Sequence, residues 1–205
     1  MIRVTTRLTH MLLGWGFVGL VYTLTDHLQP PGTVLTPGPI DQLFAFNPAA
    51  IWSYLSFFVL IPLAYLCCPA DRIRWLRISM QVAALVAGAI YLLWPTTMDY
   101  PAVTGDSLNT VMLVSLIGID SAQNCLPSLH MALTTLAVLA LQENHRPLRN
   151  LLLCFWGALI AVAVLQLRRH LFIDVLSGTA LGLFAGSLAR RVLVSSNPLP
   201  HGASS

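Results

Sequence analysis

Residues 167–178 read L-R-R-H-L-F-I-D-V-L-S-G and place charged side chains inside a strongly apolar part of the chain. His170 and Asp174 stand four residues apart, a spacing that puts two side chains on one face of a helix. The Asp174 carboxylate is therefore expected to accept a hydrogen bond from one ring nitrogen of His170 and fix its tautomer. The other ring nitrogen is then free for chemistry, with Arg168 and Arg169 directly beside it.

The composition indicates the class of protein that surrounds this stretch. Of the 205 residues, 56% are hydrophobic and 9% are charged, and the mean hydropathy is +0.73. Soluble domains carry roughly 25% charged residues, so these values predict an integral membrane protein. The net charge of +3 comes from scattered arginines and not from a basic run, so no nucleic-acid partner is expected.

Six apolar stretches approach the length of about 20 residues that a helix needs to cross a bilayer. They are residues 8–25, 51–68, 78–94, 128–142, 151–167 and 171–188. We therefore expect an all-α, polytopic bundle of six transmembrane helices that forms a single domain over residues 1–195. A shorter apolar piece at 111–119 is expected to be a re-entrant or surface helix, and the tail 196–205 is expected to be disordered.

The arginines predict the orientation of this bundle. If the N-terminus is cytoplasmic, nine of the eleven arginines fall on the cytoplasmic side, as the positive-inside rule requires. They are Arg3, Arg7, Arg72, Arg74, Arg77, Arg146, Arg149, Arg190 and Arg191. We expect both termini to be cytoplasmic in a plasma or inner membrane. Arg168 and Arg169 then lie on the outer side, where they are expected to handle something anionic.

A second motif stands at the start of the fourth stretch, where residues 124–130 read N-C-L-P-S-L-H. Pro127 is typical of the first turn of a helix, which places Ser128 and His130 in that turn. Unpaired backbone N–H groups and the helix dipole favour an anion such as phosphate there. The outer ends of the last three spans would thus gather the parts that phosphoryl transfer needs. His170 would attack phosphorus and His130 would protonate the leaving oxygen.

These residues resemble a known family. The P-S-L-H sequence at 127–130 and the H-x-x-x-D sequence at 170–174, followed by Gly178, are similar to motifs of the type 2 phosphatidic acid phosphatase superfamily. Asn124 and Arg168 resemble the branch that reads P-S-L-H and includes lipid phosphotransferases. The resemblance implies a bundle of six helices with its active site on the outer face.

The activity that the resemblance implies is a phosphatase or phosphotransferase acting on the phosphate or diphosphate of a membrane lipid. It would work through a phosphohistidine, without metal or cofactor. His170 would be the nucleophile, Asp174 its orienting carboxylate and His130 the general acid. The residues expected to bind the substrate phosphate are Ser128, Asn124, Arg168 and Arg169.

The chain departs from the family pattern in its cations. It has no Lys and no Arg–Pro pair ahead of the P-S-L-H sequence, and Val164 stands six residues before His170, where the family has an arginine. Phosphate binding would then depend on Arg168 and Arg169. For Arg168 to take part, the chain must turn between the fifth and sixth spans just before His170.

Other interpretations of the same residues stay open. A catalytically degenerate member of the family could bind or transport a lipid without chemistry. A metal or haem site is disfavoured, because one H-x-x-x-D sequence and one distant histidine make an incomplete ligand set. Three acidic residues between the third and fourth spans are expected to be solvated loop residues. They are Asp99, Asp106 and Asp120.

Overall fold

The computed structural model describes residues 3–195, which form a mostly helical bundle. Five helical segments are long and apolar enough to cross a membrane, which indicates a membrane protein. They are Val4–Leu28, Pro48–Cys67, Ala70–Leu93, Pro147–Gln166 and Phe172–Ser195. Helices of spanning length thus cover five of the six predicted stretches. The predicted disorder of 196–205 lies outside the described residues.

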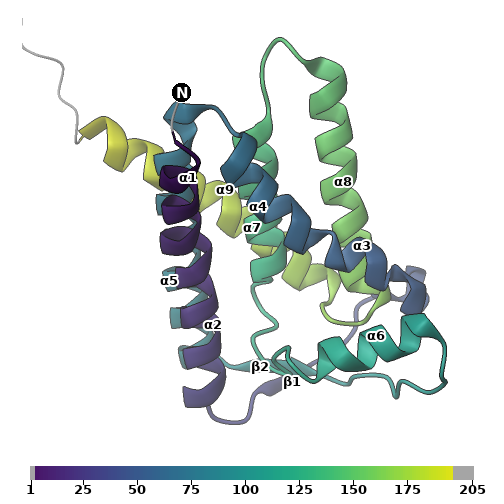
Figure 1. Ribbon diagram of the computed structural model, residues 1–205. Coiled ribbons are helices and arrows are strands. Elements are labelled where there is room, and N and C mark those ends of the chain that lie inside the picture. The colour runs from purple at the N-terminus through teal and green to yellow at the C-terminus, as the bar shows by residue number, and fades with distance from the viewer. Residues whose placement is uncertain (1–2, 196–205) are drawn as a thin grey trace, which may run out of the picture.

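The first two segments are each built from several helices. The first joins α1 (Val4–Met11), a π-helical turn (Leu12–Gly16) and α2 (Phe17–Leu28). The second joins the 3₁₀ turn Pro48–Ala50, α3 (Ile51–Leu55) and α4 (Phe57–Cys67). α3 and α4 meet at Ser56, which belongs to neither helix, and follow one another along the bundle toward α6 (Figure 1).

The remaining long segments are more regular. The third joins the 3₁₀ turn Ala70–Arg72 to α5 (Ile73–Leu93), and the last two are α8 (Pro147–Gln166) and α9 (Phe172–Ser195). Pro147 begins α8 at a position where proline costs no hydrogen bond, since the first amides of a helix have no partner within it.

The fourth predicted stretch, residues 128–142, forms the shorter helix α7 (Leu129–Leu141). Its 13 residues extend about 20 Å, less than the roughly 30 Å of a bilayer core. Ten of the 13 are buried, and the helix contacts α4, α5, α8 and α9. The apolar character of α7 therefore reflects its place at the centre of the bundle, and a six-span topology stays a proposal.

Glycines on α9 bring it very close to α7. A Cβ on Gly178 would overlap the backbone carbonyl oxygen of Ser128, and one on Gly182 would lie 2.6 Å from the carbonyl oxygen of Ala132. One turn further, Gly186 accepts a hydrogen bond of 2.8 Å from the indole of Trp75 on α5. Small residues four apart allow such backbone contact between membrane helices. This contact fixes the two sequence motifs side by side.

One end of the bundle is covered by the long loops. Strand β1 (Thr33–Leu35) pairs in parallel with β2 (Thr96–Met98), with Thr33 opposite Thr96. Helix α6 (Leu108–Ile117) lies across the same end (Figure 1). The structure places this short helix within the loop where a surface or re-entrant helix was predicted, whereas the two strands were not predicted.

Candidate active site

The site begins at a tight turn between α8 and α9. Arg168 takes a left-handed backbone conformation with φ of +52°. Its N–H donates to the carbonyl of Leu165 at 3.1 Å, and the N–H of Arg169 donates to the carbonyl of Val164 at 3.0 Å. This pair of bonds is the Schellman motif, in which glycine usually takes the left-handed position. The turn that the sequence required before His170 is therefore present.

The turn sends the two neighbouring arginines to different partners. The guanidinium of Arg168 donates to the backbone carbonyls of Asp41 and Phe44, at 3.1 and 2.8 Å. The guanidinium of Arg169 donates to Oδ2 of Asp120, from Nε at 3.1 Å and from Nη2 at 3.0 Å. Arg168 thus anchors the loop that precedes the second span, and Arg169 belongs to the polar cluster around Asp120.

Asp120 is the centre of this cluster. Its Oδ1 accepts a hydrogen bond of 2.7 Å from the Tyr22 hydroxyl, and its Oδ2 accepts one of 3.3 Å from the Tyr54 hydroxyl. Only 11% of the Asp120 side chain is exposed, so the prediction of a solvated loop residue was wrong. Arg169 is also buried, and its guanidinium lies 4.7 Å from the centre of the Tyr100 ring, where a cation–π contact adds to the ion pair.

The surroundings of Asp120 keep it ionised. Burial alone would raise its pKa. The positive charge that His130 can carry, the guanidinium of Arg169 and the Tyr22 hydrogen bond outweigh burial and hold the pKa of Asp120 below its ordinary value. The cluster therefore contains a fixed negative charge that balances Arg169.

His170 and Asp174 are adjacent, but they do not share a helical face as predicted. His170 lies in the turn before α9, and Asp174 lies in the first turn of the helix. The distance from His170 Nδ1 to Asp174 Oδ2 is 3.5 Å, and Nδ1 has no hydrogen-bond partner among the described residues. Oδ2 instead accepts the N–H of Leu171 at 2.9 Å, which caps the helix much as the acidic member of a capping box does.

Ser128 connects the two motifs through its backbone. Its N–H donates to the carbonyl of Asp174 at 3.0 Å, and its hydroxyl accepts the N–H of Met131 at 3.4 Å as the N-cap of α7. The helix therefore starts after Ser128, and Pro127 precedes the cap where a first-turn position was predicted. Ser128 is completely buried, and its amide is already bonded.

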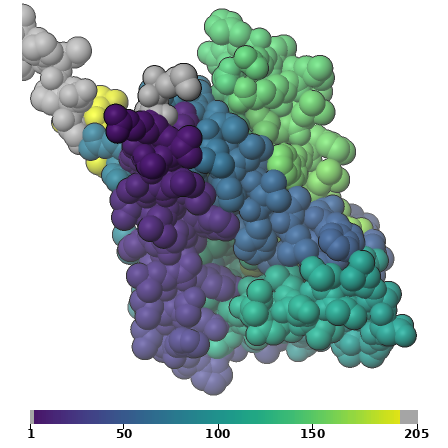
Figure 2. Space-filling model, viewed as in Figure 1, coloured from purple at the N-terminus to yellow at the C-terminus, as the bar shows by residue number. Residues whose placement is uncertain are grey.

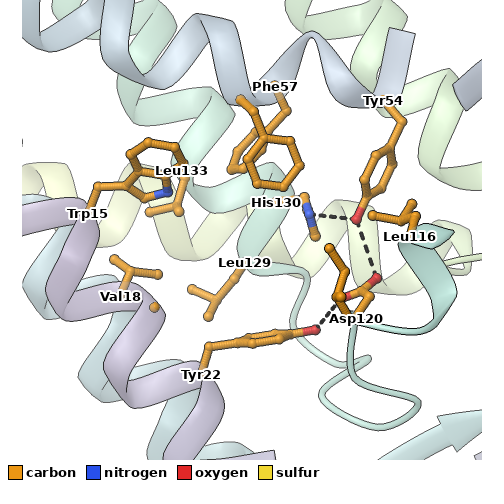
Figure 3. A pocket seen from close by; sticks show the side chains of 13 residues that line it. Trp15, Val18, Tyr22, Tyr54, Phe57, Leu116, Asp120, Leu129, His130 and Leu133 are labelled. Atoms are coloured by element: carbon orange, nitrogen blue, oxygen red, sulfur yellow. Dashed lines mark hydrogen bonds between the residues drawn. The ribbon is translucent and has the colours of Figure 1, made fainter. Parts of the chain in front are cut away.

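His130, in the first turn of α7, faces both the polar cluster and His170. The centres of the two imidazole rings are 5.8 Å apart. Nε2 of His130 lies 2.7 Å from the Tyr54 hydroxyl, which also contacts Asp120 (Figure 3). The phenol has one proton, so when it donates to Asp120 it must accept the Nε2–H of His130. Tyr54 thereby couples the protonation of His130 to Asp120.

Asn124 ties the loop before α7 to the first span. Its side-chain oxygen accepts a hydrogen bond of 2.9 Å from Gln29, and its amide donates to the carbonyl of Tyr22 at 3.2 Å. Ser121 donates to Asp26 in the same region. Asn124 itself adopts a φ of +57°, a conformation that asparagine tolerates better than most residues. The C-terminal end of α2 thus holds the loop that carries Asp120.

Sequence reasoning missed three members of this site. Tyr22 and Tyr54 stand in apolar stretches where tyrosine usually marks the membrane interface, and Asp120 stands in a loop. No local pattern links them, since their hydrogen bonds join residues 98 and 66 positions apart.

The arrangement gathers the groups that phosphoryl transfer needs. The rings of His130 and His170 lie close together, and the Asp174 carboxylate lies beside His170. The guanidinium of Arg169, the residue directly before His170, is held by a second carboxylate, that of Asp120. Of the predicted phosphate-binding residues, Arg169 joins this cluster, Ser128 caps α7, and Arg168 and Asn124 bind to other parts of the fold.

Comparison with known families gives a match to this chain. A family model described as the PAP2 superfamily matches residues 41–188, a range that includes both motifs and leaves out the first span. Comparisons with curated proteins and with solved structures give no match. Because the family match covers more than half of the 205 residues, the chain belongs to the PAP2 superfamily, whose members are generally phosphatases.

Proposed function

We propose that the protein is a metal-independent phosphatase or phosphotransferase that acts on the phosphate or diphosphate of a membrane lipid through a phosphohistidine. The observation that carries this proposal is the meeting of the two motifs. His130 and His170 come from different motifs, their ring centres lie 5.8 Å apart, and Asp174 is 3.5 Å from Nδ1 of His170. An attacking group and a proton donor need this kind of opposed placement.

In the first step, Nε2 of His170 forms a bond to phosphorus while the bond from phosphorus to the lipid oxygen breaks. His130 gives its proton to that oxygen, and the lipid leaves as an alcohol, or as a monophosphate when the substrate is a diphosphate. Asp174 stabilises the positive charge that develops on the His170 ring, since its Oδ2 faces Nδ1. The 3.5 Å separation is expected to shorten in the transition state, as catalytic hydrogen bonds often do.

In the second step, His130 takes a proton from the acceptor, and the acceptor oxygen attacks phosphorus. The bond between phosphorus and Nε2 breaks and His170 is restored. Water as acceptor gives hydrolysis, and an alcohol gives transfer. The resemblance of Asn124 and the P-S-L-H sequence to the phosphotransferase branch supports an alcohol acceptor as one form of the reaction.

Phosphate binding is assigned chiefly to Arg169. Its neighbour Arg168 is held by two backbone carbonyls outside the cluster, whereas Arg169 directly precedes the proposed nucleophile. Ser128 contributes by placing the start of α7 against Asp174, so its role is to position the two motifs.

The proposed orientation has both termini in the cytoplasm and the site on the outer face of a plasma or inner membrane. Two contacts support it. Arg7 donates to the carbonyls of Tyr65 and Cys68, and Arg72 donates to carbonyls at the end of α7, including Leu139. Arginines from two regions of the chain, Arg7 and Arg72, thus lie at the end of the bundle opposite the start of α7, as the positive-inside rule requires.

A single assay tests the proposal. Detergent-purified protein is incubated with a panel of lipid phosphates in EDTA, and release of phosphate or transfer of the headgroup is measured for wild type and His170→Ala. Wild type should be active, and the substitution should lower the rate at least about a thousandfold. His145→Ala is the matched control, since His145 is exposed in the connection between α7 and α8.

Two outcomes contradict the proposal. Activity that disappears in EDTA argues for a metal-dependent reaction. Activity that survives in His170→Ala shows that the reaction does not pass through a phosphohistidine at residue 170. A protein that binds lipid phosphates equally well with and without His170 and turns none of them over is a lipid-binding or transport member of the family.

A further inference from the structure

An apolar cavity of about 230 Å³ adjoins His130. It lies between the first span, the α3–α4 segment, α6 and α7, and Figure 3 shows most of the side chains around it. Its lining residues are almost all aromatic or aliphatic, and the polar groups His130, Asp120 and the Tyr54 hydroxyl lie together at one end. The cavity thus has a hydrocarbon interior and one charged end.

The first span supplies one wall of the cavity, through Trp15, Val18, Gly19 and Tyr22. This span lies outside residues 41–188, the part of the chain that matches the family. Trp15 and Tyr22 stand seven residues apart, which corresponds to about 10 Å along a helix. The wall therefore runs for about two helical turns away from the polar end.

The cavity opens onto the surface of the bundle. In the space-filling view the surface is hollowed where α2, α4 and α6 come together (Figure 2). Two large apolar side chains that line the cavity are also exposed at the surface, Phe58 at 42% and Ile119 at 84%. An opening bordered by exposed apolar side chains is suited to the entry of a hydrocarbon chain.

We infer that this cavity holds an alkyl chain of the lipid phosphate whose phosphate group is presented to His130 and His170. The inference rests on the proposed function and adds to it a lipid-chain site built by the first span. Three observations support this occupant: the apolar walls, the opening bordered by exposed apolar side chains, and the polar end at His130. A small water-soluble phosphate would make no use of these walls.

Gly19 offers a direct way to fill the cavity. It lines the cavity, and a Cβ at this position would meet no atom within 4 Å. Gly19→Phe therefore places a ring at the cavity wall without overlap between Cβ and its neighbours, and a helix tolerates the change because glycine is a poor helix former.

The first experiment compares hydrolysis of butyl phosphate and dodecyl phosphate by wild type and Gly19→Phe. Each substrate partitions into detergent to the same extent whichever protein is present. The rate of wild type divided by the rate of Gly19→Phe, taken for one substrate at a time, therefore reports on the cavity. We expect the substitution to lower kcat/KM for dodecyl phosphate at least about tenfold more than for butyl phosphate, since each buried methylene contributes about fourfold to binding.

Two control variants accompany it. Gly19→Ala adds only a methyl group, and Leu20→Phe adds a ring on the same helix at an exposed position that does not line the cavity. Both should keep the wild-type ratio between the two substrates. An equal loss on both chain lengths in Gly19→Phe, or the same chain-length effect in Leu20→Phe, overturns the inference.

The second experiment needs no turnover and so separates the two proposals. His170→Ala protein is irradiated with hexadecyl phosphate that carries a diazirine at the end of its chain, and the labelled peptides are identified. Labelling should fall on residues that line the cavity and should be lost when Gly19→Phe is added. Labelling elsewhere, or equal labelling by the matching diazirine-bearing alcohol, overturns the inference. Inactive wild type with labelling in the cavity overturns only the proposed function.

Discussion

Asp120 and Arg169 form an ion pair in which one carboxylate oxygen accepts two hydrogen bonds from the guanidinium, at 3.0 and 3.1 Å. Both side chains are nearly removed from solvent, with 11% and 4% of their surfaces exposed. The pair stands beside His130 and His170 and fixes the charge balance of the site. Its energetic role follows from burial, because a buried charge is stable only with its partner.

Loss of one member of this pair is therefore expected to be costly. Asp120→Asn and Arg169→Met should each lower the free energy of unfolding by about 3–5 kcal/mol. In the double variant no charge is left unpaired, so the combined loss should be smaller than the sum of the single losses. Thermal unfolding of the four proteins in one detergent measures the coupling. Strictly additive effects would show that the two charges do not depend on each other.

The same pair predicts a dependence on pH. The pKa of Asp120 is lower in the folded protein than in the unfolded chain, so ionised Asp120 contributes stability above the unfolded pKa, and this is lost as the pH falls through the folded pKa. The stability advantage of wild type over Asp120→Asn should be constant from about pH 8 to about pH 5 and shrink below about pH 4. An advantage that grows as the solution is acidified contradicts this sign.

The close contact between α7 and α9 depends on Gly178. A Cβ at this position would overlap the backbone of Ser128, which cannot move aside as a side chain could. Gly178→Ala should push the two motifs apart, lower the thermal unfolding temperature and abolish activity. Gly19→Ala is the matched control, because its Cβ meets nothing within 4 Å and it should be neutral or stabilising. Similar unfolding temperatures for both variants would refute the role of the contact.

The sequence predicted the helical elements well because they depend on local information, and it predicted the approach of the two motifs because the order of the spans puts both on one side. Apolar stretches mark helices, and the P-S-L-H and H-x-x-x-D sequences stand at the ends of such stretches. The central position of α7 could not be predicted, since a helix buried in protein and a helix facing lipid are equally apolar. The network at Asp120 was also missed, because it joins side chains from the first span, the second span and two loops.

The helix-ending turn at Arg168 is hard to recognise in the sequence, because arginine stands where glycine is usual. The Schellman turn would be easy to predict with glycine at this position. Arginine adopts the same left-handed conformation at a cost of about 1–2 kcal/mol, and its guanidinium holds the carbonyls of Asp41 and Phe44. The backbone strain can be separated from the side-chain hydrogen bonds, because alanine removes only the bonds whereas glycine removes both.

Two variants of Arg168 make this separation. Arg168→Ala loses the side-chain hydrogen bonds and keeps the strained conformation, whereas Arg168→Gly loses the bonds and relieves the strain. The glycine variant should therefore be more stable than the alanine variant by about 1 kcal/mol, and the comparison is made by thermal unfolding. If alanine proves the more stable of the two, the left-handed conformation of residue 168 is not a source of strain.

The Tyr54 hydroxyl links His130 to Asp120. A substitution that removes this hydroxyl tests whether the link contributes to proton transfer. Tyr54→Phe removes the hydroxyl and keeps the ring that lines the cavity, so substrate binding should change little. We expect kcat to fall about tenfold to a hundredfold with less than about a threefold change in KM, because a correctly placed general acid contributes about 10²–10⁴ to a rate. The pH–rate profile of the variant should also shift, since His130 no longer shares a proton with the phenol. Tyr65→Phe is the control, because the Tyr65 hydroxyl bonds to Met80 and not to the site. Unchanged kcat and an unchanged pH profile in Tyr54→Phe would show that His130 works without this partner.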